Sequence, residues 1–271
     1  MKIQNVFKVV SNEKICPRFY RLCLDACLPA RQAKPILKFI KPGQFIHIKV
    51  SDGLEPFFRR PFSVYRAQKY VEILYEPIGM GTKIMATKKP GDMLDVLGPL
   101  GNWFSLPPKK TKQIVMIAGG IGVAPFLIFS DVLKRKERFQ TVSYEMILLY
   151  GGRSGGHVFP MKEFKKNGCK VYVATDDGSV GLKGRVSQLY DKIKTDPQTT
   201  AVYTCGPSPM IASVQEFTKK HNLWCQASCE EVMACALGAC LGCSIETISG
   251  YKTVCYDGPV FDIREVIFKK Y

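Results

Sequence analysis

The first third of the chain consists of short segments with the composition of β-strands. The alternation of apolar and polar side chains is clearest at residues 45–50, and the other segments are rich in β-branched and aromatic residues. Glycine and proline separate the segments, as is typical of turns. Several short strands at such spacing predict a small antiparallel β-barrel. The predicted strands are residues 6–10, 19–24, 45–50 and 70–75, and the predicted turns are residues 41–43, 90–92 and 97–101.

The pattern changes after residue 110, where apolar runs of strand length alternate with stretches of helix length. Such alternation predicts a parallel α/β sheet with helices on both faces. The predicted strand–helix pairs are 113–118 with 124–136, 145–150 with 159–166, 170–174 with 185–193, and 201–204 with 207–220.

One apolar stretch, residues 114–130, is long enough to compare with a membrane-spanning helix. It carries no charged side chain over seventeen residues, which is the lower limit for such a helix. Three glycines and a proline interrupt it, and these residues favour a strand, a tight turn and a helix instead. We therefore expect no membrane span and no membrane partner.

The composition fits a folded protein with a sizeable core. The chain has 271 residues, of which 46% are hydrophobic and 23% charged, so an intrinsically disordered chain is excluded. Its formal net charge is +16, and the excess lies before residue 225, since residues 225–271 carry 4 basic and 6 acidic side chains. The basic residues are scattered, and no nucleic-acid-binding motif accompanies them. We therefore expect no nucleic acid partner and interpret most of the charge as solvated surface.

The cysteine content excludes a small disulfide scaffold. Such scaffolds are short and have an even number of cysteines, whereas this long chain has eleven. The N-terminal residues contain no apolar run typical of a signal peptide. We therefore expect a chain with reduced thiols and a cytoplasmic location.

Four cysteines near the C-terminus have the spacing of a plant-type [2Fe–2S] site. Cys235, Cys240 and Cys243 form C-x4-C-x2-C, and Cys255 follows. Small residues between the thiols let three of them converge while backbone N–H groups point at sulfur. Zinc is an alternative, although its usual second C-x2-C or histidine pair is missing, and disulfides are another that a reducing compartment disfavours. Six further cysteines are interpreted as buried or incidental thiols: Cys16, Cys23, Cys27, Cys169, Cys225 and Cys229.

Several motifs are typical of nucleotide cofactor sites. In the predicted barrel, residues 59–65 read Arg-Arg-Pro-Phe-Ser-Val-Tyr, and Gly79-Met80-Gly81-Thr82 opens a predicted helix at 82–88. A helix N-terminus with free N–H groups is a natural pyrophosphate site, to which Arg60 would add a charge. In the α/β region, glycine turns follow two predicted strands, although either turn by itself is also typical of an ordinary strand–turn–helix unit. The remaining motifs are residues 98–101, 118–125 and 203–210.

In this order, the motifs resemble those of the ferredoxin–NADP reductase superfamily. The C-terminal segment narrows the resemblance, because residues 230–243 and 251–261 closely resemble the electron-transfer subunits of B-type dihydroorotate dehydrogenases. The resemblance covers essentially the whole chain and implies an FAD-binding β-barrel at 1–106, an NAD-binding α/β domain at 107–224 and a [2Fe–2S] segment at 225–271. The last segment is too small for a good hydrophobic core of its own.

The resemblance also implies a function in pyrimidine (UMP) biosynthesis. In such enzymes a partner catalytic subunit oxidises dihydroorotate at its FMN, and single electrons pass through the [2Fe–2S] cluster to FAD, which delivers hydride to NAD⁺. A flavin can exchange one electron or two, whereas a cluster moves one and nicotinamide accepts a pair. The implied assembly is a heterotetramer with two copies of each subunit, which also binds NAD(H).

Other functions stay open on the residues alone. A related FAD and iron–sulfur reductase subunit would serve ferredoxin, a hydrogenase or a sulfide-linked acceptor, and a different class would be a metal-binding module or redox sensor without turnover. The set of four cysteines favours the dihydroorotate dehydrogenase subunit. NAD is the expected nicotinamide, while Arg153, which follows the second strand of the α/β region, leaves NADP open.

The resemblance assigns roles to particular residues. The chain departs from the family pattern in having Cys229 in place of an apolar residue, Glu76 in place of an arginine, and a short spacing from Cys243 to Cys255. Glu76 implies that one flavin-phosphate contact is weaker or comes from another basic residue. Cys205 is interpreted as a group that packs and orients the nicotinamide rather than as a nucleophile. The implied flavin residues are Arg60, Pro61, Phe62, Ser63, Leu74, Tyr75, Glu76, Gly81 and Thr82, the implied dinucleotide residues are Gly119, Gly120, Cys205 and Gly206, and the implied cluster ligands are Cys235, Cys240, Cys243 and Cys255.

Overall fold

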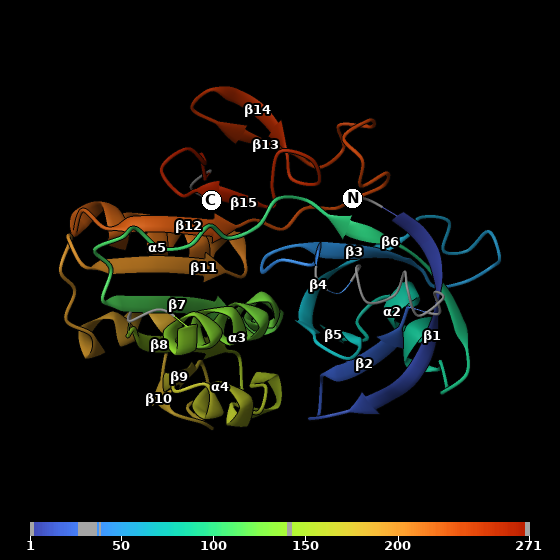
Figure 1. Cartoon of the computed structure of the whole chain (residues 1–271), viewed down its shortest axis with the longest axis horizontal. Coiled ribbons are helices and arrows are strands. Elements are labelled where there is room, and N and C mark those ends of the chain that lie inside the picture. The colour runs from blue at the N-terminus through green and yellow to red at the C-terminus, as the bar shows by residue number, and fades with distance from the viewer. Residues whose placement is uncertain (1–2, 27–36, 38, 140–142, 269–271) are drawn as a thin grey trace.

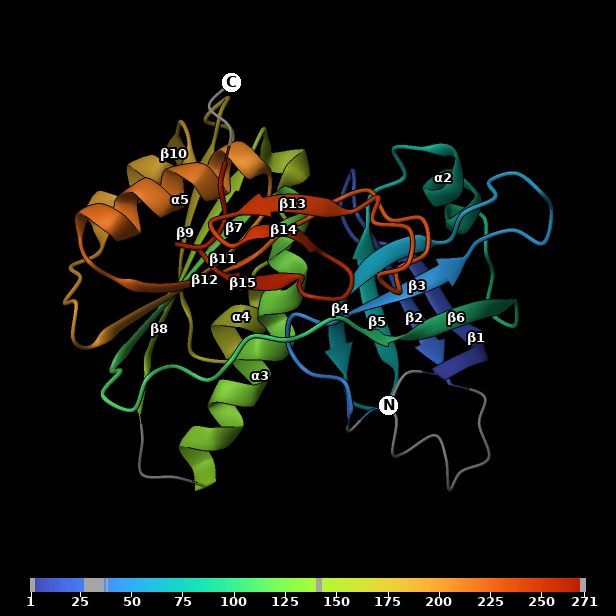
Figure 2. The same cartoon turned by 90° about the horizontal axis from the view of Figure 1, so that it is seen from above.

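A β-barrel and an α/β sheet lie side by side, and a C-terminal segment lies over both (Figure 1). Seen from above, the hairpin of β13 (Ser244–Thr247) and β14 (Gly250–Thr253) and its neighbouring loops extend from the sheet towards the barrel (Figure 2). The computed structural model describes residues 3–26, 37, 39–139 and 143–268. Cys27, interpreted above as an incidental thiol, lies outside these residues. The three-part architecture predicted from the sequence is confirmed.

Six antiparallel strands close the barrel in the order β1-β2-β5-β4-β3-β6. Alternate side chains of these strands point inward, and Leu22, Ile48, Val64 and Ile73 are among those fully buried in its core. One short helix, α2, follows β5. The bounds are β1 (Ile3–Lys14), β2 (Tyr20–Asp25), β3 (Phe45–Lys49), β4 (Arg60–Ala67), β5 (Val71–Tyr75), α2 (Met80–Ala86) and β6 (Met93–Leu100).

Strand β6 shows where the sequence prediction was wrong. Residues 97–101 were predicted as a turn because they contain two glycines and a proline, but residues 97–100 belong to the strand. β6 closes the barrel by pairing with both β1 and β3. A Cβ atom on Gly98 would lie 2.8 Å from Cγ2 of Ile46, so the glycine lets β3 and β6 approach closely.

The second part is a seven-stranded sheet in the order β10-β9-β8-β7-β11-β12-β15, in which only β15 is antiparallel to its neighbour. Helices α3 and α4 cover one face, and α5 and the 3-10 helix η3 cover the other, as predicted. The bounds are β7 (Gln113–Gly119), η1 (Gly120–Val123), α3 (Ala124–Phe139), β8 (Glu145–Gly152), η2 (Gly155–His157), α4 (Lys162–Lys166), β9 (Lys170–Thr175), β10 (Leu182–Lys183), η3 (Val186–Lys192), β11 (Thr200–Cys205), α5 (Ser208–Lys220), β12 (Trp224–Ser228) and β15 (Val260–Asp262).

Two predicted helices of this region take a different form. The helix predicted at 185–193 is the 3-10 helix η3, which begins with a hydrogen bond from Gln188 N to Arg185 O at 3.0 Å. The helix predicted at 159–166 begins only at Lys162, after the short 3-10 helix η2. The apolar stretch 114–130 forms β7, η1 and the start of α3, and the described residues include no helix long and apolar enough to cross a membrane.

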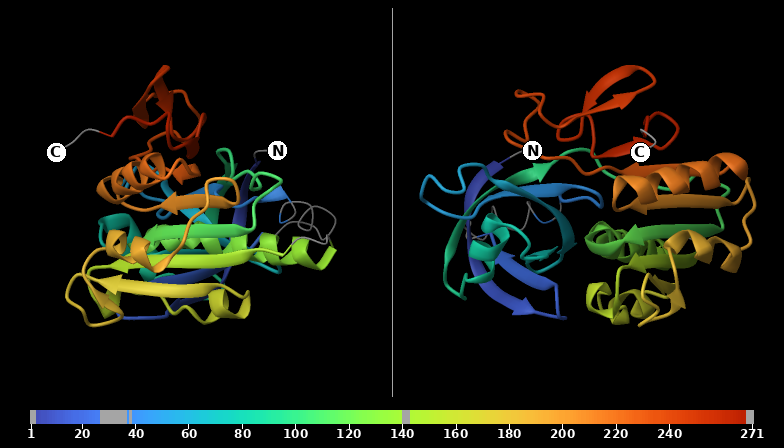
Figure 3. Two further views of the ribbon diagram at one scale, coloured as in Figure 1. Left: turned by 90° about the vertical axis from the view of Figure 1, so that its left-hand side faces the viewer. Right: turned by 180° about the vertical axis from the view of Figure 1, so that it is seen from behind.

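The C-terminal segment is attached to both other parts. Its strands β12 and β15 continue the sheet beyond β11, and a hairpin of β13 (Ser244–Thr247) and β14 (Gly250–Thr253) lies above them (Figure 3). On the barrel side, the amide of Asn102 donates to Val260 O at 2.7 Å and to Asp257 O at 2.9 Å, and it accepts from Val260 N at 2.8 Å. These bonds hold the segment against the end of β6.

Candidate functional site

Two glycine turns meet at one edge of the sheet. Strands β7 and β11 are parallel neighbours with Ala118 opposite Cys205, so the turns that follow them lie together. A Cβ atom on Gly119 would lie 2.7 Å from Sδ of Met210, and one on Gly122 would lie 2.4 Å from Cys205 O. The structure thus brings the four predicted dinucleotide residues together, with the two turns in backbone contact: Gly119, Gly120, Cys205 and Gly206.

Tyr150 supports the first turn, and the sequence did not single it out. Its ring is buried at the end of β8, and its hydroxyl donates to Gly120 O at 2.9 Å and accepts from Phe159 N at 3.3 Å. Burial raises the pKa of this hydroxyl, so it remains a hydrogen-bond donor. Further along, Arg153 is exposed beyond the end of β8, and its carbonyl accepts from Asp177 N at 3.3 Å.

A cavity of about 270 Å³ lies between the barrel and these turns. Ile121 and Ala124 line it from the α/β side, and Phe45 lines it from β3. Seven of the nine predicted flavin residues form its barrel wall, where the start of β4, the end of β5 and the first turn of α2 converge. These seven are Pro61, Phe62, Ser63, Leu74, Tyr75, Glu76 and Thr82.

The other two predicted flavin residues, Arg60 and Gly81, lie next to each other. A Cβ atom on Gly81 would lie 3.0 Å from Nε of Arg60, so the glycine makes room for the guanidinium beside α2. Arg60 also donates to the carbonyl of Phe58. Glu76, the acidic departure noted in the sequence, forms an ion pair with Arg18 from the turn between β1 and β2. Two cationic groups therefore lie at or near the rim of the cavity.

The C-terminal segment completes the wall of the same cavity and contributes two acidic residues, of which Glu230 contacts Cys205. The thiol of Cys205 donates to Oε1 of Glu230 at 3.9 Å. Burial raises the pKa of the Cys205 thiol, so Cys205 is not a thiolate. Burial likewise raises the pKa of Cys229 to about 12. The residues contributed by the segment are Ser228, Cys229, Glu230, Glu231, Met233 and Pro259.

The four predicted cluster cysteines form two pairs. Cys235 lies beside Cys240 and Cys243 beside Cys255, since in each pair the backbone N–H of the second residue donates to the thiol of the first. Backbone N–H groups point at three of the four sulfur atoms, which is the environment a thiolate-bound cluster needs. The donors are Leu237 N and Cys240 N to Cys235 Sγ at 3.4 Å each, Gly238 N to Cys255 Sγ at 3.2 Å, and Cys255 N to Cys243 Sγ at 3.4 Å.

This donor set fits a dinuclear cluster. In a four-cysteine [2Fe–2S] site, two thiolates bind each iron, and the two thiol pairs match that arrangement. A site for a single metal ion needs at least three ligands in one group, and within the described residues no three His, Cys, Asp or Glu side chains form such a group. Cys243 and Cys255 pack in one apolar cluster with Cys229 and Met233, which line the cavity described above. Two of the four thiols therefore belong to the same apolar cluster as two residues of the cavity wall.

Two family models match the chain. Residues 116–216 match the oxidoreductase NAD-binding domain, and residues 230–267 match the iron-sulfur cluster binding domain of dihydroorotate dehydrogenase B. The first includes both glycine turns, and the second includes all four paired cysteines.

Solved structures share the fold. A structure of an NADH-dependent reduced ferredoxin-NADP oxidoreductase superposes with a TM-score of 0.81 at 24% identity and covers 97% of this chain and 90% of its own. A ferredoxin NADP⁺ reductase from Neisseria gonorrhoeae superposes with a TM-score of 0.64 at 19% identity, covering 82% of this chain and 92% of its own. These similarities confirm the predicted reductase fold.

Curated relatives match over nearly the full length. The chain is 37% identical to a dihydroorotate dehydrogenase B (NAD(+)) electron transfer subunit from Bacillus cereus, over 98% of this chain and 99% of the relative. It is 34% identical to the corresponding subunit from Caldanaerobacter subterraneus subsp. tengcongensis, over 96% and 97%. Because both the cluster-domain model and these relatives agree, the chain belongs to the family of electron transfer subunits of dihydroorotate dehydrogenase B.

Proposed function

We propose that this chain carries electrons from the FMN of a dihydroorotate-oxidising partner subunit, through a [2Fe–2S] cluster and FAD, to NAD⁺ in pyrimidine biosynthesis. The observation that carries the proposal is the single cavity to which all three parts of the chain contribute walls. Ile121 and Ala124 of the first glycine turn line one side of it, the barrel residues of the flavin motifs line another, and residues of the C-terminal segment line the third. Electron carriers bound at these places would lie in sequence, close to one another.

FAD would be held by the barrel wall. Pro61, Phe62 and Ser63 would contact the ring edge, Leu74, Tyr75 and Glu76 would contact it through their backbone, and Arg60 would neutralise the pyrophosphate beside Gly81 and Thr82. Glu76 stands where the family has an arginine, and Arg18, which pairs with Glu76, would supply the missing cation. When bound, the flavin converts single electrons into the pair that nicotinamide requires.

The dinucleotide would be held by the paired turns. Gly119 and Gly120 would let the protein backbone approach the dinucleotide closely, and Cys205 and Gly206 would lie against the nicotinamide. The protonated Cys205, held by Glu230, would pack and orient the ring rather than attack it. We infer NAD rather than NADP from the relatives, which are NAD(+) enzymes by name.

The cluster would be bound by Cys235, Cys240, Cys243 and Cys255, at the face where the catalytic partner docks. Apolar side chains stand out from this segment, and Val232 is 84% exposed. We propose that this surface binds the FMN-containing subunit, in a heterotetramer with two copies of each chain. Thiolate ligands need reduced cysteines, which supports a cytoplasmic location.

Arg60→Ala is expected to weaken FAD binding about 10- to 100-fold, because a charge-assisted hydrogen bond to phosphate contributes about 1.5–3 kcal/mol. Titration of the apo-chain with FAD, followed by flavin fluorescence, measures this. Arg59→Ala is the matched control, since that guanidinium pairs with Asp95 instead. Equal FAD affinity in Arg60→Ala and the unsubstituted chain would remove Arg60 from the flavin site.

Val232→Asp is expected to weaken the complex with the catalytic partner at least about tenfold, because a buried unpaired charge opposes an apolar interface. Reduction of the bound flavin by NADH should stay unchanged. Val180→Asp, a similar change on the α/β domain, is the control. Analytical ultracentrifugation of mixed subunits gives the affinities, and an undiminished affinity in Val232→Asp would place the partner elsewhere.

Reconstitution tests the proposed function as a whole. Mixed with a dihydroorotate-oxidising subunit from the same genome, the chain should confer dihydroorotate-dependent formation of NADH that neither subunit catalyses alone. If the complex instead passed electrons only to ferredoxin or another acceptor, the chain would belong to a different redox system.

A further inference from the structure

A polar network joins the barrel to the α/β domain at the far end of β4. Nε of Arg66, on β4, lies 3.1 Å from Oδ2 of Asp131 on α3, and its Nη2 lies 3.2 Å from Oε2 of Glu163 on α4. The side chain of Gln68 donates to the same Oδ2 at 3.3 Å. One arginine of the barrel therefore contacts both helices on this face of the sheet.

Asp131 is held from its own domain as well. The amide of Asn167, which follows α4, donates to Oδ1 of Asp131 at 2.7 Å and to the hydroxyl of Ser130 at 2.8 Å. The side chains of Arg66 and Asp131 are only 16% and 10% exposed. A shielded ion pair with further hydrogen bonds on the carboxylate has a defined geometry, unlike an exposed surface pair.

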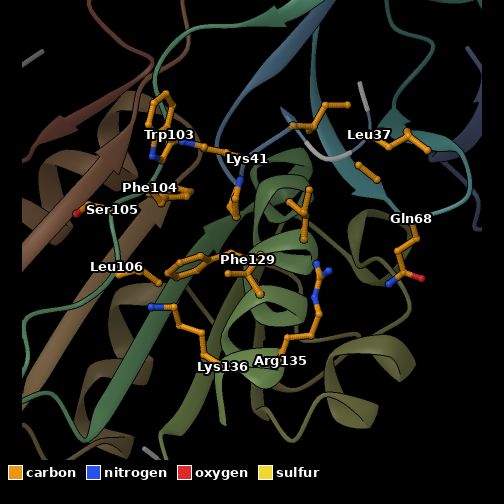
Figure 4. Close-up of a pocket in the computed structure, with 15 residues that line it drawn as sticks. Leu37, Lys41, Gln68, Trp103, Phe104, Ser105, Leu106, Phe129, Arg135 and Lys136 are labelled. Atoms are coloured by element: carbon orange, nitrogen blue, oxygen red, sulfur yellow. The ribbon is translucent and has the colours of Figure 1, made fainter. Parts of the chain in front are cut away.

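The network lies beside a groove and next to an apolar contact between the two domains. A groove of about 1010 Å³ opens between barrel and α/β domain, and Figure 4 shows Gln68 contributed by the barrel and Arg135 and Lys136 by α3. Apolar side chains also meet near the network, because Tyr65 of β4 packs edge-on against Phe159 and Ile128 of α3 belongs to the apolar cluster of the barrel core. The contacts of Arg66 and Gln68 add directional hydrogen bonds to this boundary.

The two elements that carry the network also carry the two cofactor sites. Ser63 of the flavin motif and Arg66 are three residues apart on β4, which corresponds to about 10 Å of strand. Ala124, which lines the cavity beside the glycine turn, and Asp131 are seven residues apart on α3, which corresponds to about 10 Å of helix. The contact between Arg66 and Asp131 thus connects β4 to α3, and the other end of each element faces the cavity.

We propose that Arg66 and Asp131 are positioning residues, which fix the barrel against α3 and so hold the flavin and nicotinamide sites at the separation that hydride transfer requires. This inference rests on the function proposed above. In hydride transfer, two electrons and one proton leave NADH together, and displacement of the reacting groups by about 1 Å costs on the order of 100-fold in rate. Neither residue touches either cofactor site.

Arg66→Ala should therefore slow reduction of the bound flavin by NADH about 10- to 100-fold. Reduction of the same flavin by dithionite, which needs no nicotinamide geometry, should be unchanged, as should the affinities for FAD and NADH. Glu163→Gln, which removes the ion pair between Arg66 and Glu163 but leaves that with Asp131, should have a smaller effect. Arg66→Lys should recover part of the rate. Lys170→Ala removes an exposed ion pair with Glu145 inside the α/β domain and is the matched control.

A second readout needs no cofactor turnover. Residual dipolar couplings of backbone amides report the relative orientation of the two domains, and Arg66→Ala should change or average them while Lys170→Ala should not. Unchanged couplings together with an unchanged NADH-driven rate in a folded Arg66→Ala chain would overturn the inference. Failure of NADH to reduce the flavin of the unsubstituted chain would instead overturn the proposed function, and the couplings would still test the connection between domains.

Discussion

Cys240→Ser is expected to abolish dihydroorotate-dependent reduction of NAD⁺, with a loss of more than about 100-fold, while FAD stays bound. Cys240 is the exposed member of the first thiol pair, and a serine hydroxyl does not replace a thiolate ligand of iron. The barrel wall that would hold FAD has no contact with this thiol, so reduction of the flavin by NADH should persist. Iron and sulfide analysis, flavin content and both activities measure the outcome.

Cys16→Ser provides the control for the cysteine substitution. Cys16 is partly buried between the barrel and the α/β domain, where its thiol lies 4.0 Å from Gly156 O, so a serine replaces it with a side chain of similar size away from the cluster cysteines. It should retain full cluster content and activity. A Cys240→Ser chain that kept its iron, or that lost FAD together with iron, would contradict the separation of the cluster and flavin sites.

Gly122→Ala is expected to reduce the rate of flavin reduction by NADH on the order of 100-fold with FAD content unchanged. The added Cβ would lie 2.4 Å from the oxygen and 2.6 Å from the carbonyl carbon of Cys205, and 2.8 Å from Cα of Gly206. All three are backbone atoms, so relief of the overlap must separate the two turns. That separation would displace the dinucleotide from the cavity.

Stopped-flow mixing of the oxidised chain with NADH measures this rate, and urea unfolding shows whether the variant is folded. Gly53→Ala is the control, because its Cβ would find no atom nearer than Ser51 Oγ at 3.5 Å. A folded Gly122→Ala chain that reacts with NADH at the unsubstituted rate would show that the contact between the turns is not needed for hydride transfer.

The fold was largely predictable because its periodic patterns are local. Alternation in the first third and strand–helix alternation after residue 113 gave the barrel and the sheet correctly. The end of β6 was not predictable, since Gly98 and Pro99 have the composition of a turn. Their place in a strand depends on Ile46 of β3, which is distant in sequence and leaves no room for a Cβ at residue 98. A short window of sequence does not contain that contact.

In the candidate site, too, local features were predictable from the sequence and contacts between distant segments were not. The spacing of the four cysteines predicts a common site, because the loop that joins three of them is short. The contact of Cys205 with Glu230 was not predictable, since it arises from the parallel pairing of β11 with β12, which sets Cys205 opposite Ser228. Likewise, Tyr150 reaches Gly120 only because β8 lies beside β7. Such support residues come from the order of strands in the sheet.

The visible absorption spectrum of the purified chain, recorded anaerobically before and after addition of NADH, tests the central claim most directly. The account predicts flavin and [2Fe–2S] bands that both bleach on addition of NADH, because electrons pass from the dinucleotide through the flavin to the cluster. A colourless chain that contains zinc, or a coloured one whose bands do not respond to NADH, would contradict it.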